Sequence, residues 1–377
     1  MQRLTVTPRP DWRSHVERDL GFVFHTIDGA PYWDETACYR FNAAEIDALE
    51  DATVELEAMA LALVDRVVSN GEEDLERLRI PRHAWEAIAG SWHAGEKNLY
   101  GRFDLAYRGN GPPKLLEYNA DTPTALFEAS VVQWDWLEAM WPGRDQFNSL
   151  HERLIEAWGN FGIGGDRLYF TAVKDHLEDN GTIEYLRDTA LQAGLNTERI
   201  AIEDIGWDGA SFLDLENRPI LALFKLYPWE WLIQEDFGRH LLSGVAKVIE
   251  PAWKMILSNK AALALLWEMA PDHPNLLPAS LEPGAIAGKT VRKPIYSREG
   301  ANIQVIESGE VLSDSGGHYG AEGFVYQAYH ELPAFDGGYP VIGSWVVASQ
   351  PAGIGIREDA TAITRDTSRF VPHFFED

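Results

Sequence analysis

The longest helical pattern in the chain runs from Ala43 to about Ser69. Apolar residues recur there at a spacing close to one helical turn, and Asn42 just before them is a suitable N-cap. The apolar positions are Ile46, Leu49, Leu56, Ala60 and Val64. We expect two further helices, over Trp85 to Glu96 and from about Leu126 through Met140. The first hundred residues therefore read as mainly helical.

A hairpin is predicted between the second and third of these helices. Residues Leu99 to Tyr107 and Lys114 to Ala120 alternate as strands do. The loop between them, Gly109 to Pro113, contains an Asn-Gly step, which favours the positive φ angles of a tight turn. We therefore expect the two strands to pair antiparallel.

The pattern changes between Arg167 and Tyr227, where short apolar segments alternate with one helical stretch. A strand, a helix and further strands in this order indicate a small parallel sheet. The expected helix is Asn180 to Ala193, and the expected strands are Leu168 to Val173, Arg199 to Glu203 and Ile220 to Leu226.

The segment from Ile249 to Met269 reads as a helix in two pieces, and a proline-rich passage follows it. From Lys289 onward the pattern is that of strands and turns. The expected strands are Thr290 to Pro294, Asn302 to Glu307, Phe324 to Tyr329, Val341 to Val347 and Gly353 to Arg357.

Composition narrows the class of protein. A length of 377 residues favours two or three subdomains over one core, and the 14 tryptophans and 45% hydrophobic residues suffice for folded cores. Acidic residues outnumber basic ones by 59 to 32, so the formal net charge is −27. This charge disfavours nonspecific binding to nucleic acid or to an anionic membrane, and it would attract an amine. An acidic surface that serves solubility alone is the other interpretation.

The ends of the chain and its cysteine content point to a cytoplasmic protein. Cys38 is the single cysteine, which excludes an intrachain disulfide and a paired-thiol zinc site. Charged residues interrupt the N-terminal segment, so we expect no signal peptide, and no apolar run approaches the length of a membrane span.

The hairpin carries the strongest chemical signal. Side chains alternate faces along a strand, so Arg102 and Asp104 share one face, as do Glu117 and Asn119. If Arg108 lies opposite Pro113, then Asp104 faces Glu117. Two facing carboxylates repel unless a proton or a cation lies between them, and Mg²⁺ takes one or two carboxylates together with phosphate oxygens. An ordinary hairpin with a solvated polar face is the alternative.

Two lysines in the second half are candidates for binding phosphate. Lys293 ends a strand and precedes the polar loop Ser297 to Asn302, which contains Gly300 and could present backbone N-H groups to a phosphate. The pattern of a Walker-type loop is missing. Lys260 is the second candidate, because its ammonium group could also reach a phosphate. For both lysines an exposed, solvated side chain is the alternative.

Three further residues are candidates for ligand contacts. Gln327 ends an apolar strand, a position suited to hydrogen bonds with an adenine edge. Arg357 follows a glycine-rich strand, where it either closes over an anion or pairs with a neighbouring carboxylate. Glu230 lies between two tryptophans, which suits an ammonium group but also suits plain core packing.

Taken in order, six segments resemble the synthetase part of the glutathionylspermidine synthase family, which has a permuted ATP-grasp fold. The similarity extends from about Trp92 to His373 and is carried by RFD (102–104), LLEYNADTPT (115–124), SNK (258–260), KPIYSREGAN (293–302), VYQ (325–327) and AGIGIRED (352–359). No cysteine-histidine hydrolase signature is found in the first hundred residues, so we expect ligation without an amidase activity.

The resemblance implies a role for each candidate. Asp104, Glu117 and Asn119 match magnesium ligands, and Arg102 matches the arginine that stabilises the transferring phosphate. Lys260 and Lys293 match ATP-phosphate lysines, the loop with Ser297 and Gly300 matches a lid, and Gln327 lies in the adenine segment. For the substrates, the matching residues are Thr122, Thr124, Glu230 and Arg357.

The resemblance also implies an α+β, ATP-grasp-like fold with an α/β substrate-binding subdomain and a lid. We expect a mainly helical region over 1–95 and a catalytic sheet with the magnesium-binding hairpin from 96–160 and 320–377. A substrate subdomain over 165–250 and a lid subdomain over 251–319 complete the division.

The implied reaction is amide formation. ATP and Mg²⁺ would activate a small carboxylate as an acyl phosphate, which an amine then attacks. Three possibilities stay open at this stage: ligation of glutathione to spermidine, ligation of another peptide and amine pair, and nucleotide binding without catalysis. The sequence does not fix the oligomeric state.

Overall fold

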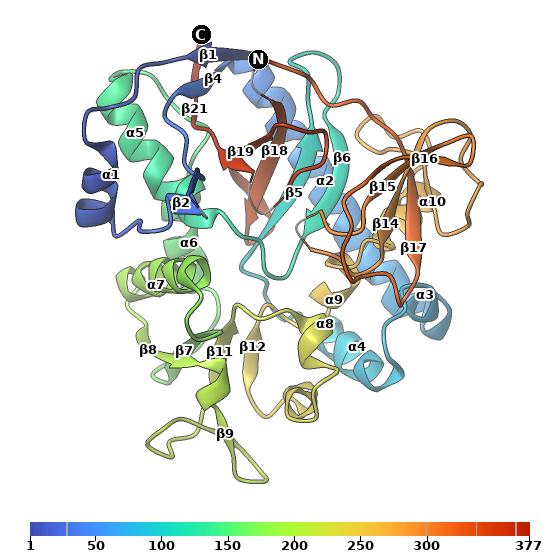
Figure 1. Ribbon diagram of the computed structural model, residues 1–377. Helices are drawn as coiled ribbons and strands as arrows, with labels where there is room; N and C mark the ends of the chain where they lie inside the picture. Colours follow the sequence, from blue (N-terminus) through green and yellow to red (C-terminus); the bar gives the residue numbers. More distant parts are fainter. Residues whose placement is uncertain (28, 299, 337, 366–367) are drawn as a thin grey trace.

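The computed structural model describes residues 1–27, 29–298, 300–336, 338–365 and 368–377. It is a mixed α/β structure in which the predicted hairpin forms one edge of a five-stranded antiparallel sheet. The strand order is β20–β19–β18–β5–β6, and these strands lie at the centre of Figure 1. Their bounds are β20 (Arg369–Phe370), β19 (Gln350–Asp359), β18 (Tyr339–Val347), β5 (Tyr100–Ala106) and β6 (Lys114–Asn119).

The register of the hairpin is as predicted where the candidate site lies. Arg102 is opposite Asn119, and Asp104 is opposite Glu117. A shift follows between Asp104 and Leu105, beyond which Leu105 pairs with Leu115. The register that we counted from the loop is therefore wrong by one residue at the loop end, because sequence alternation does not reveal a bulge. The positive φ angles fall on Gly109 and Gly111.

The predicted long helix is α2 (Ala43–Asn70), and it begins as expected. The side chain of Asn42 accepts a hydrogen bond from the Glu45 backbone, and the Glu45 side chain accepts one from the Asn42 backbone, each at 2.9 Å. The expected apolar positions of α2 are buried. The helix packs against β18 and β19, and the hydroxyls of Thr53 and Ser344 lie 2.6 Å apart across this contact.

The N-terminal region contains strands that we did not predict. β4 (Ala37–Asn42) lies between β1 (Gln2–Thr5) and β21 (His373–Glu376), and its pairing with β21 is parallel. This sheet brings the two ends of the chain together at the top of Figure 1. The other elements here are α1 (Trp12–His15), the π-helix η1 (Val16–Leu20), β2 (Thr26–Ile27), β3 (Ala30–Pro31), α3 (Glu72–Arg77), η2 (Arg82–Ala84) and α4 (Trp85–His93).

The parallel sheet is confirmed. Its order is β12–β11–β7–β8, and every neighbouring pair is parallel. The strands are β7 (Arg167–Ala172), β8 (Asn196–Ala201), β11 (Ala222–Lys225) and β12 (Lys247–Ile249), with α7 (Leu177–Gln192) connecting β7 to β8. The other elements between β6 and β12 along the chain are η3 (Glu128–Val132), α5 (Gln133–Met140), α6 (Leu150–Trp158), η4 (Ile202–Asp204), β9 (Gly206–Trp207), β10 (Phe212–Leu213), α8 (Trp229–Leu232) and η5 (Gly238–Ser243).

The helix predicted from Ile249 to Met269 begins later than expected. Ile249 ends the strand β12, and the two helical pieces are the shorter α9 (Lys254–Leu257) and α10 (Ala262–Met269). A buried strand and a buried helix share the same apolar composition over a few residues, so the pattern alone did not separate them.

A third sheet carries Lys293 on β14 and Gln327 on β17. Its order is β13–β17–β14–β15–β16, and all of its pairs are antiparallel. The strands are β13 (Ala279–Ser280), β14 (Thr290–Pro294), β15 (Gln304–Glu307), β16 (Glu310–Asp314) and β17 (Phe324–Ala328). β17 lies within 320–377, which we had grouped with the hairpin sheet, and it pairs here with β13 and β14. The division into subdomains stays a prediction.

Within the described part of the chain, no helix is both long enough and apolar enough to cross a lipid bilayer.

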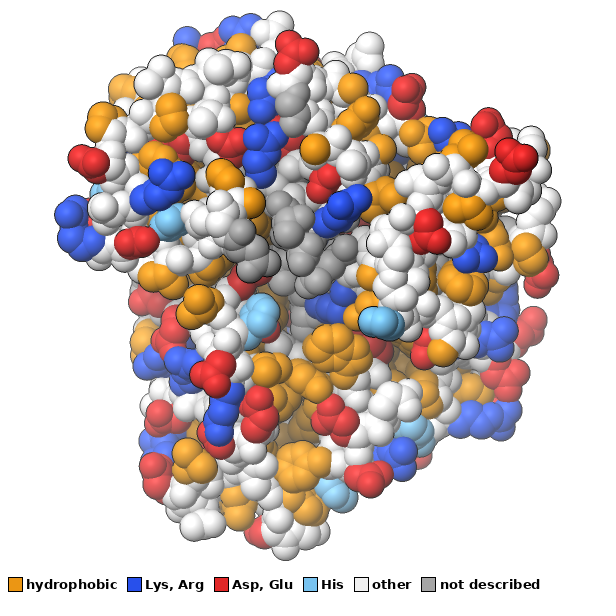
Figure 2. All heavy atoms as spheres, in the orientation of Figure 1, with side chains coloured by type: hydrophobic (Ala, Val, Ile, Leu, Met, Phe, Trp, Pro, Cys, Tyr) orange, Lys and Arg blue, Asp and Glu red, His pale blue; other side chains and the backbone are white. Residues whose placement is uncertain are grey.

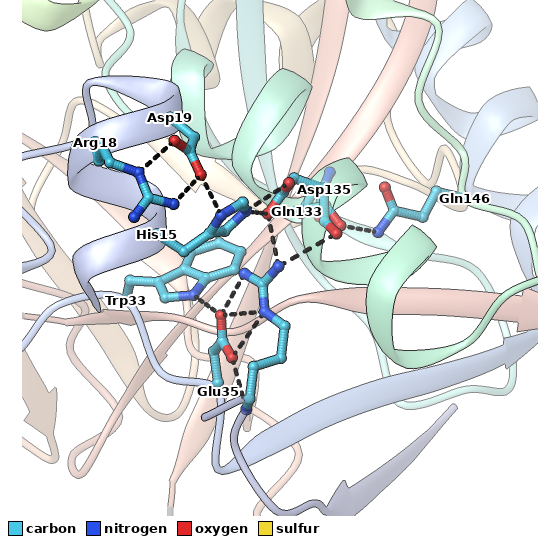
Figure 3. Close-up of polar contacts among 9 residues, drawn as sticks. His15, Arg18, Asp19, Trp33, Glu35, Gln133, Asp135 and Gln146 are labelled. Carbon is cyan, nitrogen blue, oxygen red and sulfur yellow. Dashed lines mark hydrogen bonds and ion pairs between the residues drawn. The ribbon is translucent and has the colours of Figure 1, made fainter. Parts of the chain in front are cut away.

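A network of charged side chains ties the N-terminal segment to α5 (Figure 3). The guanidinium of Arg9 donates to Glu35 Oε1 at 2.7 Å and to Asp135 Oδ2 at 2.6 Å. His15 Nε2 lies 3.0 Å from the same Asp135, and its Nδ1 lies 2.8 Å from Asp19. Arg18 pairs with Asp19 at the outer end. The network runs from a buried carboxylate, Glu35, to an exposed pair at the surface.

We predict that Arg9→Ala lowers the free energy of unfolding by about 2–4 kcal/mol, because it leaves the Glu35 carboxylate, whose side chain is 0% exposed, without its cation. Arg18→Ala is the matched control, since the Arg18 side chain is 72% exposed and solvent screens its ion pair with Asp19. Urea unfolding of both variants measures the difference. Equal losses would show that the buried end of the network is not the stabilising part.

Candidate active site

Two carboxylates and an arginine meet on one face of the hairpin. Arg102 donates from Nε to Asp104 Oδ1 at 2.6 Å and from Nη2 to Asp104 Oδ2 at 3.1 Å. Its third nitrogen donates to the carbonyl oxygen of Thr124 at 2.5 Å. Glu117 lies across the strand pair from Asp104, and the Asn119 amide reaches both carboxylates, at 3.1 Å and 3.4 Å. The predicted juxtaposition is therefore present.

The two carboxylates have different electrostatic surroundings. Burial raises the pKa of Asp104, and the Arg102 guanidinium opposes this shift without cancelling it. Burial also acts to raise the pKa of Glu117, but the ammonium groups of Lys260 and Lys293 outweigh burial and lower this pKa to about 2. Glu117 is thus held as a carboxylate by cations that come from outside the hairpin.

Both predicted lysines lie at the hairpin. Lys260, between α9 and α10, places Nζ 3.2 Å from Glu117 Oε2 and donates to the Ser297 carbonyl at 2.5 Å. Lys293, on β14, donates to the Leu116 carbonyl and to Gln327 Oε1, each at 2.8 Å. Burial lowers the pKa of Lys293 to about 8, with Glu117 acting in the opposite direction. Neither side chain is the solvated lysine of the alternative interpretation, because both are mostly buried.

Gln327 has its amide fully engaged. Its Oε1 accepts from Lys293, and its Nε2 donates to the Leu115 carbonyl at 3.0 Å. The side chain therefore bridges β14 and β6. Contacts of this side chain with a ligand would require a rearrangement of the amide.

A cavity of about 780 Å³ opens beside these residues. Its walls are largely apolar, and Lys293, Gln327, Asp104 and Glu117 supply polar groups. Apolar walls with a few converging polar groups are typical of sites for small ligands. The apolar lining comes from Leu116, Leu277, Val291, Ile303, Val305, Leu332, Val341 and Ile363.

A second cavity, of about 800 Å³, shares Asp104, Glu117, Gly300 and Thr364 with the first one. Its lining is polar. Eleven of the predicted site residues line it, and the other two, Lys293 and Gln327, line the first cavity. The eleven are Arg102, Asp104, Glu117, Asn119, Thr122, Thr124, Glu230, Lys260, Ser297, Gly300 and Arg357. The structure thus brings together residues separated by more than two hundred positions, which supports one site.

The loop from Ser297 to Asn302 borders both cavities, although Glu299 within it lies outside the described residues. Ser297 Oγ is buried and has no hydrogen-bond partner among the described residues. Gly300 has a φ of +69°, and a Cβ there would lie 2.3 Å from the Thr364 carbonyl oxygen. The glycine is therefore required by backbone conformation and by space.

Sequence reasoning missed Arg298 as a site residue. Its Nη2 donates to Thr122 Oγ1 at 2.7 Å and to the Thr122 carbonyl at 3.2 Å, and Nη1 lies 3.4 Å from Glu230 Oε1. The loop motif quoted for the resemblance includes this arginine. Its position next to Ser297 was the one available signal, and its partners are far away in the sequence.

A buried ion pair under the site was missed as well. Lys225 donates to Asp121 Oδ1 at 2.6 Å, and the Trp229 backbone donates to Asp121 Oδ2 at 2.8 Å. Both side chains are buried, at 0% and 2% exposure. The pair connects the end of the hairpin to β11 and to the start of α8, and α8 carries Glu230. A buried lysine looks like any other lysine in the sequence, so no local signal could have revealed it.

The hairpin has the donor set for one magnesium ion. Among the described residues no three His, Cys, Asp or Glu side chains form a metal cluster, so the protein would supply two carboxylates and the Asn119 amide. Mg²⁺ accepts such a set because it completes its coordination with water and phosphate oxygens. Asn119 now points its amide nitrogen at the carboxylates, so its oxygen would turn toward the ion.

Comparisons with known proteins identify the family of this chain. The family model described as glutathionylspermidine synthase preATP-grasp matches residues 3–376. A Haemophilus influenzae protein with the provisional name acid–amine ligase is 44% identical over the full length of both chains. The bifunctional glutathionylspermidine synthetase/amidase of Escherichia coli is 27% identical, and the match covers 89% of this chain and 58% of that protein.

Solved structures support the fold. A glutathione synthetase-like effector from Globodera pallida aligns with a TM-score of 0.54 at 10% identity, covering 89% of each chain. At that identity the likeness concerns the fold alone, and it agrees with an ATP-grasp-like α/β architecture. With the family model matched over almost every residue, this chain belongs to the glutathionylspermidine synthase preATP-grasp family.

Proposed function

We propose that this chain uses ATP to join a small carboxylate to an amine, forming an amide by way of an acyl phosphate. The enzyme class, an ATP-dependent carbon–nitrogen ligase, follows from the family and its relatives. One observation supports the mechanism most directly. Asp104 and Glu117 lie beside three cationic side chains at the point where the apolar cavity joins the polar one. The three cations are Arg102, Lys260 and Lys293.

The apolar cavity suits the adenosine end of ATP. Its aliphatic walls would enclose the base, and Gln327 on β17 lies in the lining of the same cavity. Lys293 and Lys260 lie where this cavity meets the polar one, so the triphosphate would run between them toward the hairpin. Two ammonium groups already balance Glu117, and phosphate oxygens would share them.

The hairpin would then stabilise phosphoryl transfer. A carboxylate oxygen of the substrate attacks the γ-phosphorus, the bond to ADP breaks, and negative charge spreads over the transferring oxygens. Arg102 is buried and held rigidly by Asp104 and Thr124, so it is oriented before the charge develops. Magnesium bound at Asp104, Glu117 and Asn119 would supply further charge stabilisation.

The amine completes the reaction. Its nitrogen attacks the acyl carbon, phosphate leaves, and the nitrogen loses a proton to give the amide. The loop from Ser297 to Asn302 would act as a lid that keeps water from the acyl phosphate. Its place after β14, at the border of both cavities, supports a lid subdomain over 251–319. The position of Glu230 in the lining of the polar cavity supports a substrate subdomain over 165–250.

Glutathione and spermidine are the first substrates to test, because they are named in the family and in the E. coli relative. Thr122 and Thr124 would contact the acyl substrate, Glu230 the amine, and Arg357 a substrate carboxylate. All four line the polar cavity. The net charge of −27 also favours a cationic amine over an anionic polymer as the partner.

A screen tests this assignment. Purified protein with ATP and Mg²⁺ is offered pools of small acids and amines, and ADP release is recorded. We expect release that needs both an acid and an amine, with glutathione plus spermidine as the first pair. Activity with other acid and amine pairs, but none with glutathione plus spermidine, would show that the enzyme uses different substrates. Tight ATP binding without turnover in any pool would indicate a nucleotide-binding protein and reject the ligase.

We predict that Asp104→Asn and Glu117→Gln each lower kcat by about a hundredfold or more, because each removes one of the charges that hold the metal and the phosphates. Amine-dependent ADP release measures the loss. Glu331→Gln is the matched control, since Glu331 is exposed and pairs with Arg108 on the hairpin loop. Retention of full activity by both site variants would contradict the proposed site.

We predict that Lys293→Met weakens ATP binding by roughly 10- to 100-fold, the usual cost of losing a hydrogen bond to a charged group. The measurement is calorimetric titration with a nonhydrolysable ATP analogue and Mg²⁺. Lys289→Met is the control, because Lys289 lies just before β14 and stacks on Tyr329 at 3.9 Å. Equal effects of the two changes would show that Lys293 is not a phosphate ligand.

A further inference from the structure

Arg298 fills a subsite that has the features of a cation-binding site. Two oxygens of Thr122 accept its hydrogen bonds, the Glu230 carboxylate lies 3.4 Å away, and the Trp231 ring centroid lies 5.6 Å from its guanidinium carbon. Acceptor oxygens, a carboxylate and an indole face are the groups that bind organic ammonium and guanidinium ions. The subsite is therefore suited to any such cation.

The subsite also requires a cation. Glu230 is mostly buried, and burial raises its pKa, while the charge of Arg298 acts in the opposite direction. A buried carboxylate without a counter-charge is unfavourable and takes up either a proton or another cation, so the departure of Arg298 favours the entry of a replacement cation. Exchange of one cation for another avoids most of this cost.

Arg298 lies where the polar cavity meets a third cavity, of about 1630 Å³, which we call the outer cavity. Four residues line both: Thr122, Thr124, Arg298 and Arg357. Glu230 lines the polar cavity, whereas Trp231 lines the outer one. The guanidinium thus contacts the two sides of the passage between them.

The outer cavity combines apolar and acidic walls. Its apolar part includes Phe24, Leu226 and Trp231. The acidic part consists of Asp175, from the segment that connects β7 to α7, and of Glu178 and Asp179, from the first turn of α7. Figure 2 shows hydrophobic side chains gathered in the lower middle of the molecule with acidic side chains beside them. Such a lining favours a flexible aliphatic chain that carries positive charges.

We propose that Arg298 is an internal competitor of the amine substrate, and that an aliphatic diamine or polyamine entering through the outer cavity displaces its guanidinium from Thr122, Glu230 and Trp231. This inference rests on the proposed function, which supplies the amine. One ammonium group takes the place of the guanidinium, and the acidic wall of the outer cavity balances the remaining charge. Arg298 is then a specificity-determining residue, since a neutral or anionic nucleophile cannot displace it.

Displacement of Arg298 also affects the loop from Ser297 to Asn302, which borders the apolar cavity. Arg298 directly follows Ser297, whose carbonyl oxygen accepts from Lys260. Loss of the contacts with Thr122 and Glu230 frees this part of the loop from the hairpin and from α8. Amine binding is thereby coupled to the position of the loop over the phosphates.

The test measures amine binding without ATP. Spermidine is the probe, and calorimetric titration compares the wild-type chain with Arg298→Gln. Removal of an internal competitor raises the competent fraction of the protein, so we expect spermidine to bind about three- to tenfold more tightly to the variant. Arg298→Ala serves as a second variant if the first is unstable in thermal melting, and it should show the same direction.

Arg357→Gln is the charge-matched control. Arg357 lines the same two cavities, so its loss removes one positive charge from the same place, but its own side chain donates to the Arg365 carbonyl. A smaller gain in this control than in Arg298→Gln supports displacement over general electrostatics. Equal gains in the two variants overturn the proposal, as does weaker or absent spermidine binding in Arg298→Gln.

The proposal and the proposed function can fail separately. Tighter spermidine binding by Arg298→Gln, with no turnover of any acid and amine pair by the wild type, would reject the ligase and keep the cation subsite. Ligase activity in the wild type, with no gain of amine affinity in Arg298→Gln, would keep the ligase and reject the competition.

Discussion

The structure depends on the placement of two carboxylates, Asp104 and Glu117, opposite each other on adjacent strands. Alone, this arrangement is repulsive. Three cations from different parts of the chain compensate it: Arg102 on the same hairpin, Lys260 between two short helices and Lys293 on another sheet. The neighbouring strand β18 has a glycine, Gly343, beside Arg102, and a Cβ there would lie 2.6 Å from Arg102 Cδ. The glycine therefore leaves space for the arginine side chain. The same charges that balance the carboxylates make a surface for phosphate.

Buried ion pairs hold the parallel sheet against this hairpin. Lys225 on β11 pairs with Asp121 at the hairpin end. Lys254, on α9, donates to the carbonyl oxygens of Tyr100 on β5 and of Ala120 just after β6, each at 3.0 Å. Buried pairs add little net stability, but breaking one is costly, so they fix geometry more than they add free energy. Their effect is to keep α8, with Glu230, in place across the polar cavity from the hairpin.

Local pattern was enough to predict the hairpin and the long helix, but not α8, which carries Glu230. Strand alternation gave the pairing of Asp104 with Glu117, and helical spacing with the Asn42 cap gave α2. Pairings between distant segments, such as β4 with β21, leave no local trace and were missed. Arg298 and Lys225 were missed for the same reason, because burial and partners turn an ordinary basic residue into a functional one. The bulge after Asp104 depends on the strand pair rather than on either strand.

The proposed mechanism requires that the hairpin carboxylates bind a metal ion together with the nucleotide. Mn²⁺ replaces Mg²⁺ in such sites and can be titrated by electron paramagnetic resonance in the presence of ADP. We predict one nucleotide-dependent Mn²⁺ site in the wild-type chain and its loss in the Asp104→Asn, Glu117→Gln double variant. Undiminished nucleotide-dependent Mn²⁺ binding by that variant would contradict the account.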